Sequence, residues 1–465
     1  MGTQIPRKLG MTTLDLAIRG GTVVTAERTF EGDVGISGER IAEVGRVGDA
    51  REVIDASGLL LLPGVVDVHT HIGGSTRQHP HGTADDFESG TIAAACGGVT
   101  SVIDYARQLE GQTPLQAVTE WQERAVGKAV IDYSFHLIVS DFGAGLTDGL
   151  RELVSAGFPS VKAFMMNLYE DQLLRLMTAA RDSGALVMAH AESFAVLDYQ
   201  KQRLFAEGKR DARWYVDSRP EIGEAEATSR AIDYGDLTGA DVCVVHLSCA
   251  AALERVRAAK ARGSRIRAEV RPCYLLLDRT CYDQPNRDPL EFTGCPPLRS
   301  AENIDPLWAG LADRTLDVVA SDHATWTLEQ KRQGADDFST IPQGIPALET
   351  ELGSLWTAGV VGGKVSPSRL VEAMCTTPAR LHGLYPRKGT IAVGSDADLV
   401  LLDPRKTGTI SQQNLHSRAG YEPCEGMSYQ GWPVLTVSRG EVVVRNGEYV
   451  ASAGRGQLLR RAASS

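Results

Sequence analysis

The spacing of apolar runs divides the chain into two similar ends around a different middle. Residues 14–62 carry short apolar runs that break at glycine-containing turns, and the same pattern returns at 389–450. Short runs separated by turn residues are typical of antiparallel strands. Because both ends share this pattern, we predict that residues 1–63 and 389–465 together build one β-sandwich domain.

The middle of the chain, residues 64–388, alternates strand-like apolar runs with helix-length segments. One such segment, 173–181, places its apolar residues at helical spacing. The strand-like runs lie near 65–71, 99–104, 132–139, 160–165, 185–190, 242–246, 265–271 and 316–321. Eight strands that alternate with helices predict an α/β fold, a (β/α)8 barrel of the TIM type.

Composition narrows the class of function. The chain has 465 residues, a formal net charge of −11 and 43% hydrophobic residues, which is ordinary for a large soluble protein. No cluster of lysine and arginine stands out and no apolar run is long enough to cross a membrane, so we expect neither nucleic acid nor a membrane as partner. The eight cysteines form no C-x-x-C pair, and no signal peptide is evident, so we expect a reduced, cytoplasmic protein.

Candidate metal ligands stand where the strand-like runs end. The first run ends in His69 and His71, and side chains two residues apart in a strand project from the same face. Two other runs end in His190 and His246, and the last leads into Asp322. Barrel enzymes carry their chemistry at the carboxyl ends of the strands, so we expect these side chains to meet on one rim. For any one of them alone a structural role remains open, such as a helix N-cap for Asp322.

A lysine inside an apolar run adds a second kind of ligand. Lys162 stands in the middle of 160–165, and burial lowers a lysine's pKa and makes the neutral amine available. Such an amine can add CO2 to give a carbamate, which is anionic and can bridge two cations. The alternative is an ion pair between Lys162 and an acid such as Glu192. Nitrogen and oxygen ligands without thiolate suit two divalent metal ions, zinc first, with manganese or cobalt possible.

Several motifs resemble those of one enzyme family. They lie at 64–71, 84–91, 189–192, 274–278, 296–299, 341–346 and 394–400. With these motifs the sequence resembles the cyclic amidohydrolases of the amidohydrolase superfamily, specifically the dihydropyrimidinase and hydantoinase branch, with allantoinases as near relatives. The resemblance runs over nearly the whole chain.

The resemblance implies a set of six ligands: His69, His71, Lys162, His190, His246 and Asp322. The first two histidines and the aspartate would hold one zinc ion, the other two histidines the second, and carboxylated Lys162 would bridge both. A metal-bridging hydroxide would open the ring of a cyclic amide or imide such as a hydantoin or dihydropyrimidine. Asp322 would carry the proton to the leaving nitrogen. Family members are commonly homotetramers, and we expect the same of this chain.

The sequence departs from the family at the expected substrate contacts. The family's tyrosine five residues after the lysine is replaced by Asn167, with Tyr169 two residues later, while Cys295 replaces a serine and Gln343 an asparagine. We expect all four residues to lie at the substrate. Because the missing tyrosine would stabilise the developing oxyanion, we expect a substituted ring, or a different cyclic amide, to be preferred over dihydrouracil.

The sequence leaves other functions open. The chain could be an allantoinase or a hydrolase of a bulkier or non-cyclic amide, and a catalytically inactive dihydropyrimidinase-like scaffold is disfavoured by the complete ligand set. We interpret the loop histidines His79 and His81 as solvated. Arg77 and Arg107 could meet an anionic group, but their positions along the chain do not decide this.

Overall fold

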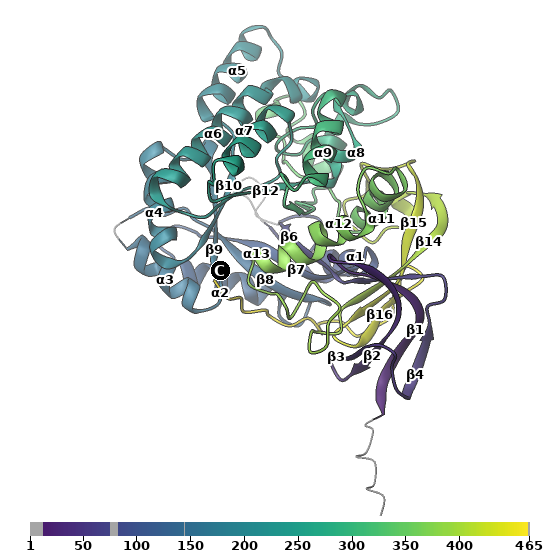
Figure 1. The fold of residues 1–465 in the computed structure, drawn as a ribbon. Coiled ribbons are helices and arrows are strands. Elements are labelled where there is room, and N and C mark those ends of the chain that lie inside the picture. The colour runs from purple at the N-terminus through teal and green to yellow at the C-terminus, as the bar shows by residue number, and fades with distance from the viewer. Residues whose placement is uncertain (1–12, 75–81, 144, 464–465) are drawn as a thin grey trace, which may run out of the picture.

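A computed structural model describes residues 13–74, 82–143 and 145–463. This part of the chain forms a parallel sheet that curves into a barrel and a second sheet built from both ends of the chain (Figure 1). Arg77, His79 and His81 lie outside the described residues. Among the described helices, none has the length and apolar character needed to cross a membrane.

The barrel strands follow one another around the sheet in sequence order. They are β6 (Val65–Thr70), β7 (Val99–Arg107), β8 (Asp132–Ile138), β9 (Ser160–Phe164), β10 (Leu186–His190), β11 (Val242–Val244), β12 (Ile266–Val270) and β13 (Val318–Val319). Every neighbouring pair is parallel. A parallel bridge between Thr70 and His323 joins β6 to the segment after β13. Each predicted run overlaps one of these strands, although β7 extends to Arg107, three residues beyond the predicted run at 99–104. The predicted (β/α)8 fold is confirmed.

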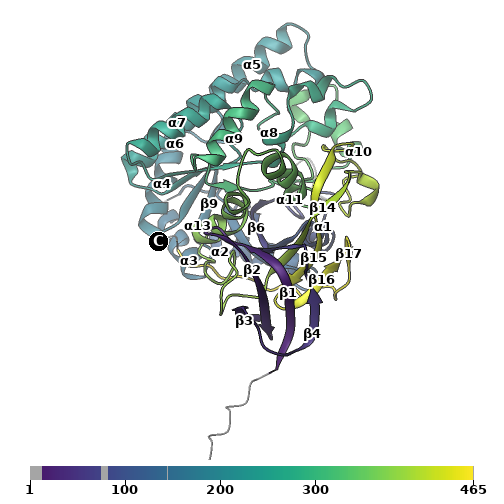
Figure 2. The ribbon, with the colours of Figure 1, turned by 45° about the vertical axis from the view of Figure 1, so that its right-hand side comes forward.

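Helices cover the outside of the barrel (Figures 1 and 2). Of these, α3, α4 and α6 lie on the side of the barrel that faces away from the second sheet. The longer helices are α1 (Phe87–Cys96), α2 (Pro114–Ala125), α3 (Leu146–Ser155), α4 (Glu170–Ser183), α5 (Phe194–Ala206), α6 (Glu221–Thr238), α7 (Ala250–Ala261) and α9 (Ile304–Ala312). The shorter ones are α8 (Pro272–Leu276), α10 (Leu328–Arg332), α11 (Glu351–Leu355), α12 (Pro367–Val371) and α13 (Thr377–Leu381). Helix α4 shows the reason for this packing: Leu173, Leu176 and Met177 are buried at helical spacing.

The second sheet joins the two ends of the chain. Its order is β17-β16-β15-β14-β5-β1-β2-β3, with β4 also paired to β1. The strands are β1 (Leu14–Val24), β2 (Thr29–Ser37), β3 (Arg40–Gly45), β4 (Ala50–Asp55), β5 (Leu60–Pro63), β14 (Leu399–Thr409), β15 (Ser428–Ser438), β16 (Glu441–Arg445) and β17 (Glu448–Tyr449). The antiparallel pair of β5 and β14 connects the amino-terminal and carboxy-terminal strands, as predicted.

Pairing within this sheet is not wholly antiparallel. Strand β1 pairs in parallel with β4 along its first half and with β5 along its second half. The reason is that β2 and β3 form an antiparallel meander with β1, after which the chain returns to the free edge of β1 in the same direction. Local alternation and turn residues predict strands but not the edge at which a returning strand pairs.

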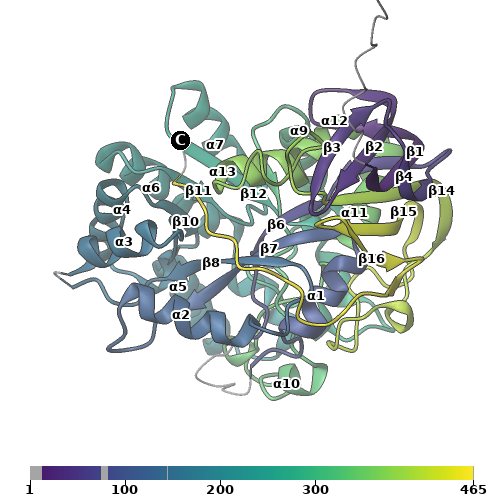
Figure 3. The ribbon, with the colours of Figure 1, turned by 90° about the horizontal axis from the view of Figure 1, so that it is seen from below.

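The end of the chain leaves this sheet and packs against the barrel (Figure 3). The Leu459 N–H donates to the Tyr133 carbonyl at 2.7 Å. The buried Arg461 donates to the Phe135 carbonyl at 2.6 Å and to the Ser160 hydroxyl at 2.8 Å. This segment therefore covers the side of the barrel opposite the carboxyl ends of the strands, although the sequence pattern placed it in the sheet domain. The boundaries at 63/64 and 388/389 stay a prediction.

A buried ion cluster holds the two sheets together. The Lys388 ammonium lies 2.6 Å from an Asp132 oxygen on β8, 2.9 Å from Asp396 and 2.6 Å from Asp398 just before β14. All four side chains are buried. A buried lysine of this kind stays charged only because several carboxylates compensate the loss of hydration.

Candidate metal centre and substrate cavity

The end of β6 and the segment after β13 meet at the carboxyl rim of the barrel. One Asp322 oxygen lies 3.1 Å from His69 Nε2 and 3.3 Å from His71 Nε2. The Lys162 ammonium nitrogen, from β9, lies 3.2 Å from the same His69 nitrogen. Four of the six predicted ligands are thus within reach of one another, as expected for side chains at neighbouring strand ends.

The other two predicted ligands complete the group. The His190 ring, at the end of β10, lies 4.4 Å from the His246 ring, and His246 lies 5.4 Å from His69, both measured between centroids. Ligand atoms of His69, His246 and Asp322 all lie within 4.8 Å of one another. The buried Nδ1 of His246 has no hydrogen-bond partner in the described chain. A buried imidazole nitrogen without a hydrogen-bond partner at this spacing fits a site for a cation.

Backbone strain marks two of these positions. His246 has φ of 42° and Asp322 has φ of 49°, a left-handed conformation that is unfavourable for residues other than glycine. Strain of this kind is retained where the surrounding structure enforces it, and it concentrates at functional sites. His246 stands two residues after the end of β11, and Asp322 stands three residues after the end of β13.

A carboxylate that the sequence analysis did not single out orients His69. Glu269 on β12 places one oxygen 2.6 Å from His69 Nδ1, and the same oxygen accepts the His246 N–H at 3.1 Å. This contact fixes the ring so that His69 Nε2 faces Lys162 and Asp322, the arrangement found around metal-binding histidines. The available signal was an acidic residue within the predicted strand at 265–271.

A buried arginine, also missed, holds Asp322. Arg271 is 1% exposed and its Nη1 lies 3.2 Å from the second oxygen of Asp322. Although burial acts to raise the pKa of Asp322, Arg271 and the neighbouring His69 and His71 hold this pKa well below its ordinary value. Asp322 is therefore a carboxylate with one oxygen toward the histidines and the other toward Arg271.

Lys162 is in the environment that carboxylation requires. It is 1% exposed, and burial lowers its pKa to about 8, so a useful fraction is neutral near neutral pH. The alternative ion pair with Glu192 is not formed. Glu192 instead lies 2.7 Å from His190 Nε2 and 2.7 Å from an Arg219 guanidinium nitrogen, so it orients His190 as Glu269 orients His69.

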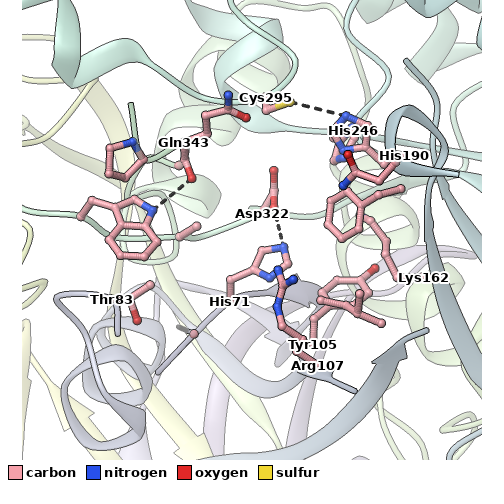
Figure 4. Close-up of a pocket in the computed structure, with 18 of the residues that line it drawn as sticks. His71, Thr83, Tyr105, Arg107, Lys162, His190, His246, Cys295, Asp322 and Gln343 are labelled. Carbon is pink, nitrogen blue, oxygen red and sulfur yellow. Dashed lines mark hydrogen bonds and ion pairs between the residues drawn. The ribbon is translucent and has the colours of Figure 1, made fainter. Parts of the chain in front are cut away.

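A cavity of about 470 Å³ opens over this group of residues (Figure 4). Asn167, Cys295 and Gln343 line it, together with Lys162 and Asp322, so the structure brings three of the four predicted substrate contacts to the site. The fourth, Tyr169, is 75% exposed and does not line the cavity. It stands just before α4, and the structure does not bring its hydroxyl to the site.

A different tyrosine lies in the cavity wall. Tyr105 on β7 stacks against His71 with centroids 4.9 Å apart, and the Lys162 ammonium lies 4.7 Å from the centre of its ring. The Tyr105 side chain is 1% exposed, and its hydroxyl has no hydrogen-bond partner in the described ranges. The sequence analysis missed it because one tyrosine at the end of an apolar run carries no distinguishing signal.

Two other histidines, His136 and His416, lie outside the ligand group. His136 is held by the Ser160 hydroxyl at 2.6 Å and the Val68 carbonyl at 2.9 Å within the barrel. His416 lies beside Glu349, with 2.7 Å between Nδ1 and the carboxylate. Neither lines the cavity.

Comparisons with known proteins identify the family of this chain. The profile of the Amidohydrolase family matches residues 60–443. A D-hydantoinase of Geobacillus stearothermophilus is 39% identical over 96% of both chains. Among solved structures, a dihydropyrimidinase from Brevibacillus agri NCHU1002 superimposes with a TM-score of 0.93 at 41% identity, covering 97% of this chain and 99% of the other. A D-hydantoinase from Bacillus sp. AR9 gives 0.94 at 41% identity, covering 97% and 100%. The chain belongs to the amidohydrolase family, in the branch of the hydantoinases and dihydropyrimidinases.

Proposed function

We propose that this hydrolase opens the ring of a cyclic amide or imide, of the hydantoin or dihydropyrimidine type, with the help of two divalent metal ions. One observation carries the proposal: Lys162, Asp322 and four histidines meet at the carboxyl rim, where all of them except His69 line one cavity. The relatives named hydantoinases and dihydropyrimidinases support the class of substrate.

The donor set suits a two-metal site. His69, His71 and Asp322 would hold one ion and His190 with His246 the other, and a carbamate on Lys162 would bridge them. Oxygen and nitrogen donors favour zinc, with manganese or cobalt as alternatives. When bound, these ions would polarise the ring carbonyl and lower the pKa of a water molecule toward neutrality.

The protein's own residues would orient the reaction. Asp322, anionic and fixed by Arg271, would accept the proton of the attacking water and deliver it to the leaving ring nitrogen. Glu269 and Glu192 would keep the imidazoles of His69 and His190 in fixed orientations, because each carboxylate binds one ring nitrogen.

Specificity would come from the cavity wall. Asn167 is shorter than the tyrosine that the family pattern has at this position, and losing one oxyanion donor costs about 10²–10³ in kcat. Tyr105, whose hydroxyl is free of protein partners in the described residues and whose ring lies beside Lys162, is the side chain we propose as a replacement donor. The space left by Asn167 would accept a substituted ring, so we expect 5-substituted hydantoins to be preferred over dihydrouracil.

Metal analysis and a substrate screen test this function together. Purified protein is expected to contain about two metal ions per chain and to hydrolyse a 5-substituted hydantoin. The same screen with dihydrouracil, allantoin, lactams and linear amides separates the proposed function from an allantoinase or a hydrolase of a bulkier or non-cyclic amide. Protein with two bound metal ions that hydrolyses none of the cyclic amides would refute the proposal.

The role of Lys162 has its own test. Lys162→Ala is expected to lose most bound metal and activity, and short carboxylic acids are expected to restore part of both by taking the place of the carbamate. Lys364→Ala is the control, because it removes an exposed ammonium that is paired with Asp305. Full metal content and activity in Lys162→Ala would exclude a bridging carbamate.

The expected cytoplasmic location and homotetrameric assembly stay predictions. Light scattering on the purified protein would test the assembly.

A further inference from the structure

Arginines surround the cavity, and they differ in how their charges are compensated. Arg219 lines the cavity and is paired with Glu192 at 2.7 Å, while Arg271 is paired with Asp322 at 3.2 Å. Arg107 lines the same cavity but makes no hydrogen bond or ion pair through its side chain with any residue in 13–74, 82–143 or 145–463. The segments outside these ranges contain no aspartate or glutamate, so they offer no carboxylate side chain for Arg107.

The position of Arg107 in its strand aims it at the cavity. It is the last residue of β7 and is paired with Ile138 of β8, which also lines the cavity. Tyr105, two residues earlier, lines the cavity and stacks on His71. Because strand side chains alternate, Tyr105 and Arg107 share the inner face, and Figure 4 draws both on the side of the cavity where His71 lies. Arg107 therefore lies two residues further along β7 than Tyr105, and so further out from the predicted metal ligands, which form what we call the metal-binding floor.

Arg107 is exposed to solvent where it lines the cavity, and no carboxylate of the described chain compensates its charge. The protein around the guanidinium partly desolvates it and lowers the pKa of Arg107 below its ordinary value, with no carboxylate acting against that shift. An arginine remains protonated at neutral pH even so. Its planar fork matches the two oxygens of a carboxylate, and such charge-assisted pairs are stronger than neutral hydrogen bonds. An anion that enters the cavity would supply the negative charge that no carboxylate of the described chain provides to Arg107.

We propose that Arg107 binds a carboxylate on the ring substituent of the substrate, so that this enzyme prefers cyclic amides with an acidic side chain. The inference rests on the proposed ring-opening function and names its substrate class. Two residues of strand span about 7 Å, so a carboxylate at the end of a short extended chain reaches Arg107, whereas one attached directly to the ring stays near the metal-binding floor.

The test compares two substrates of the same shape. One is 5-(2-carboxyethyl)hydantoin and the other is its primary amide, which replaces the carboxylate with a neutral group of equal size. The measured quantity is the ratio of kcat/KM for the acid to kcat/KM for the amide. Wild type is expected to prefer the acid, and Arg107→Gln to lower the ratio about 10- to 100-fold, the worth of hydrogen bonds to a charged group. Arg107→Lys keeps the positive charge but not the planar guanidinium, so its ratio should lie between those of wild type and Arg107→Gln.

A matched control separates direct binding from general charge effects. Arg175→Gln removes the same charge from an exposed pair with Asp171, and it is expected to leave the ratio unchanged. A ratio that Arg107→Gln does not change, or that Arg175→Gln lowers equally, overturns the inference while hydrolysis of the amide still supports the proposed function.

A binding measurement keeps the two hypotheses distinguishable. If wild type hydrolyses neither these two hydantoins nor any other cyclic amide of the screen, the proposed function fails, and calorimetric titration of both compounds into wild type and Arg107→Gln then decides the inference. Tighter binding of the acid that is lost in Arg107→Gln supports Arg107 as a carboxylate site. Equal binding of the acid to both proteins, or no binding of the acid to wild type, overturns it.

Discussion

The contact between Glu269 and His69 allows the charge of one carboxylate to be removed almost without a change of shape. In Glu269→Gln the amide carbonyl can take the place of the oxygen that contacts His69 Nδ1 at 2.6 Å and accepts the His246 N–H at 3.1 Å. Both contacts survive, and the negative charge behind His69 is lost. The new amide NH2 group takes the place of the other carboxylate oxygen, which has no hydrogen-bond partner in the described chain, so the NH2 group has no acceptor there.

The expected effect follows from these two changes. Removing a carboxylate that supports a metal-binding histidine lowers metal affinity about 10- to 100-fold, or about 1.4–2.7 kcal/mol. The buried amide without an acceptor lowers the free energy of unfolding by about 1–3 kcal/mol. The first effect concerns the metal, and the second is present with or without it.

The assay measures the two quantities separately. Competition with a chelator of known affinity gives the dissociation constant of the metal for wild type and Glu269→Gln. Urea unfolding of the metal-free proteins gives the change in stability. Glu351→Gln is the control: burial raises the pKa of Glu351 well above its ordinary value, which favours its neutral form, and both its oxygens lack partners in the described chain.

Two results would refute this reasoning. Unchanged metal affinity in Glu269→Gln would mean that the carboxylate does not support a metal-binding histidine. An equal loss of metal affinity in Glu351→Gln would attribute the effect to a general disturbance of the barrel interior, because the Glu351 carboxyl holds none of the predicted ligands.

Four further predictions address other parts of the molecule. Asp322→Asn should keep part of the metal but lower kcat about 10²–10⁴-fold, the worth of general acid–base catalysis, and an unchanged kcat would assign proton transfer elsewhere. Tyr105→Phe should lower kcat without lowering the free energy of unfolding, because the hydroxyl has no partner in the described residues; a kcat equal to wild type would exclude it as a donor. Burial raises the pKa of Glu422 to about 8 from 4.5, so the folded state holds this proton more tightly and its contribution to stability falls as pH rises from about 4.5 to 8; Glu422→Gln should therefore gain stability relative to wild type over that range, and a constant difference would contradict this. Lys388→Met should cost about 3–5 kcal/mol because it leaves buried carboxylates unpaired, and an unchanged urea midpoint would show that the cluster does not join the two sheets.

The sequence by itself determined the barrel and the group of candidate ligands. Strand alternation and strand ends are local properties, so the apolar runs predicted the barrel strands, and their last residues predicted His69, His71, His190 and His246 at one rim. Once the strands are parallel and adjacent in a barrel, the residues at their carboxyl ends all lie at the same rim. The motif at 64–71, together with the other motifs, indicated the resemblance to the cyclic amidohydrolase family.

The tertiary structure alone decided which charges are compensated and which side chains face the cavity. Glu269 and His69 are 200 positions apart, and Arg271 meets Asp322 from a different strand. Such pairings depend on how strands and loops pack, and no local pattern reports them. For the same reason Tyr169, expected at the substrate, lies 75% exposed outside the cavity, whereas Arg107 lies in its wall without a side-chain partner in the described chain. Local sequence determines where a strand ends, but packing between distant segments determines what its last side chain meets.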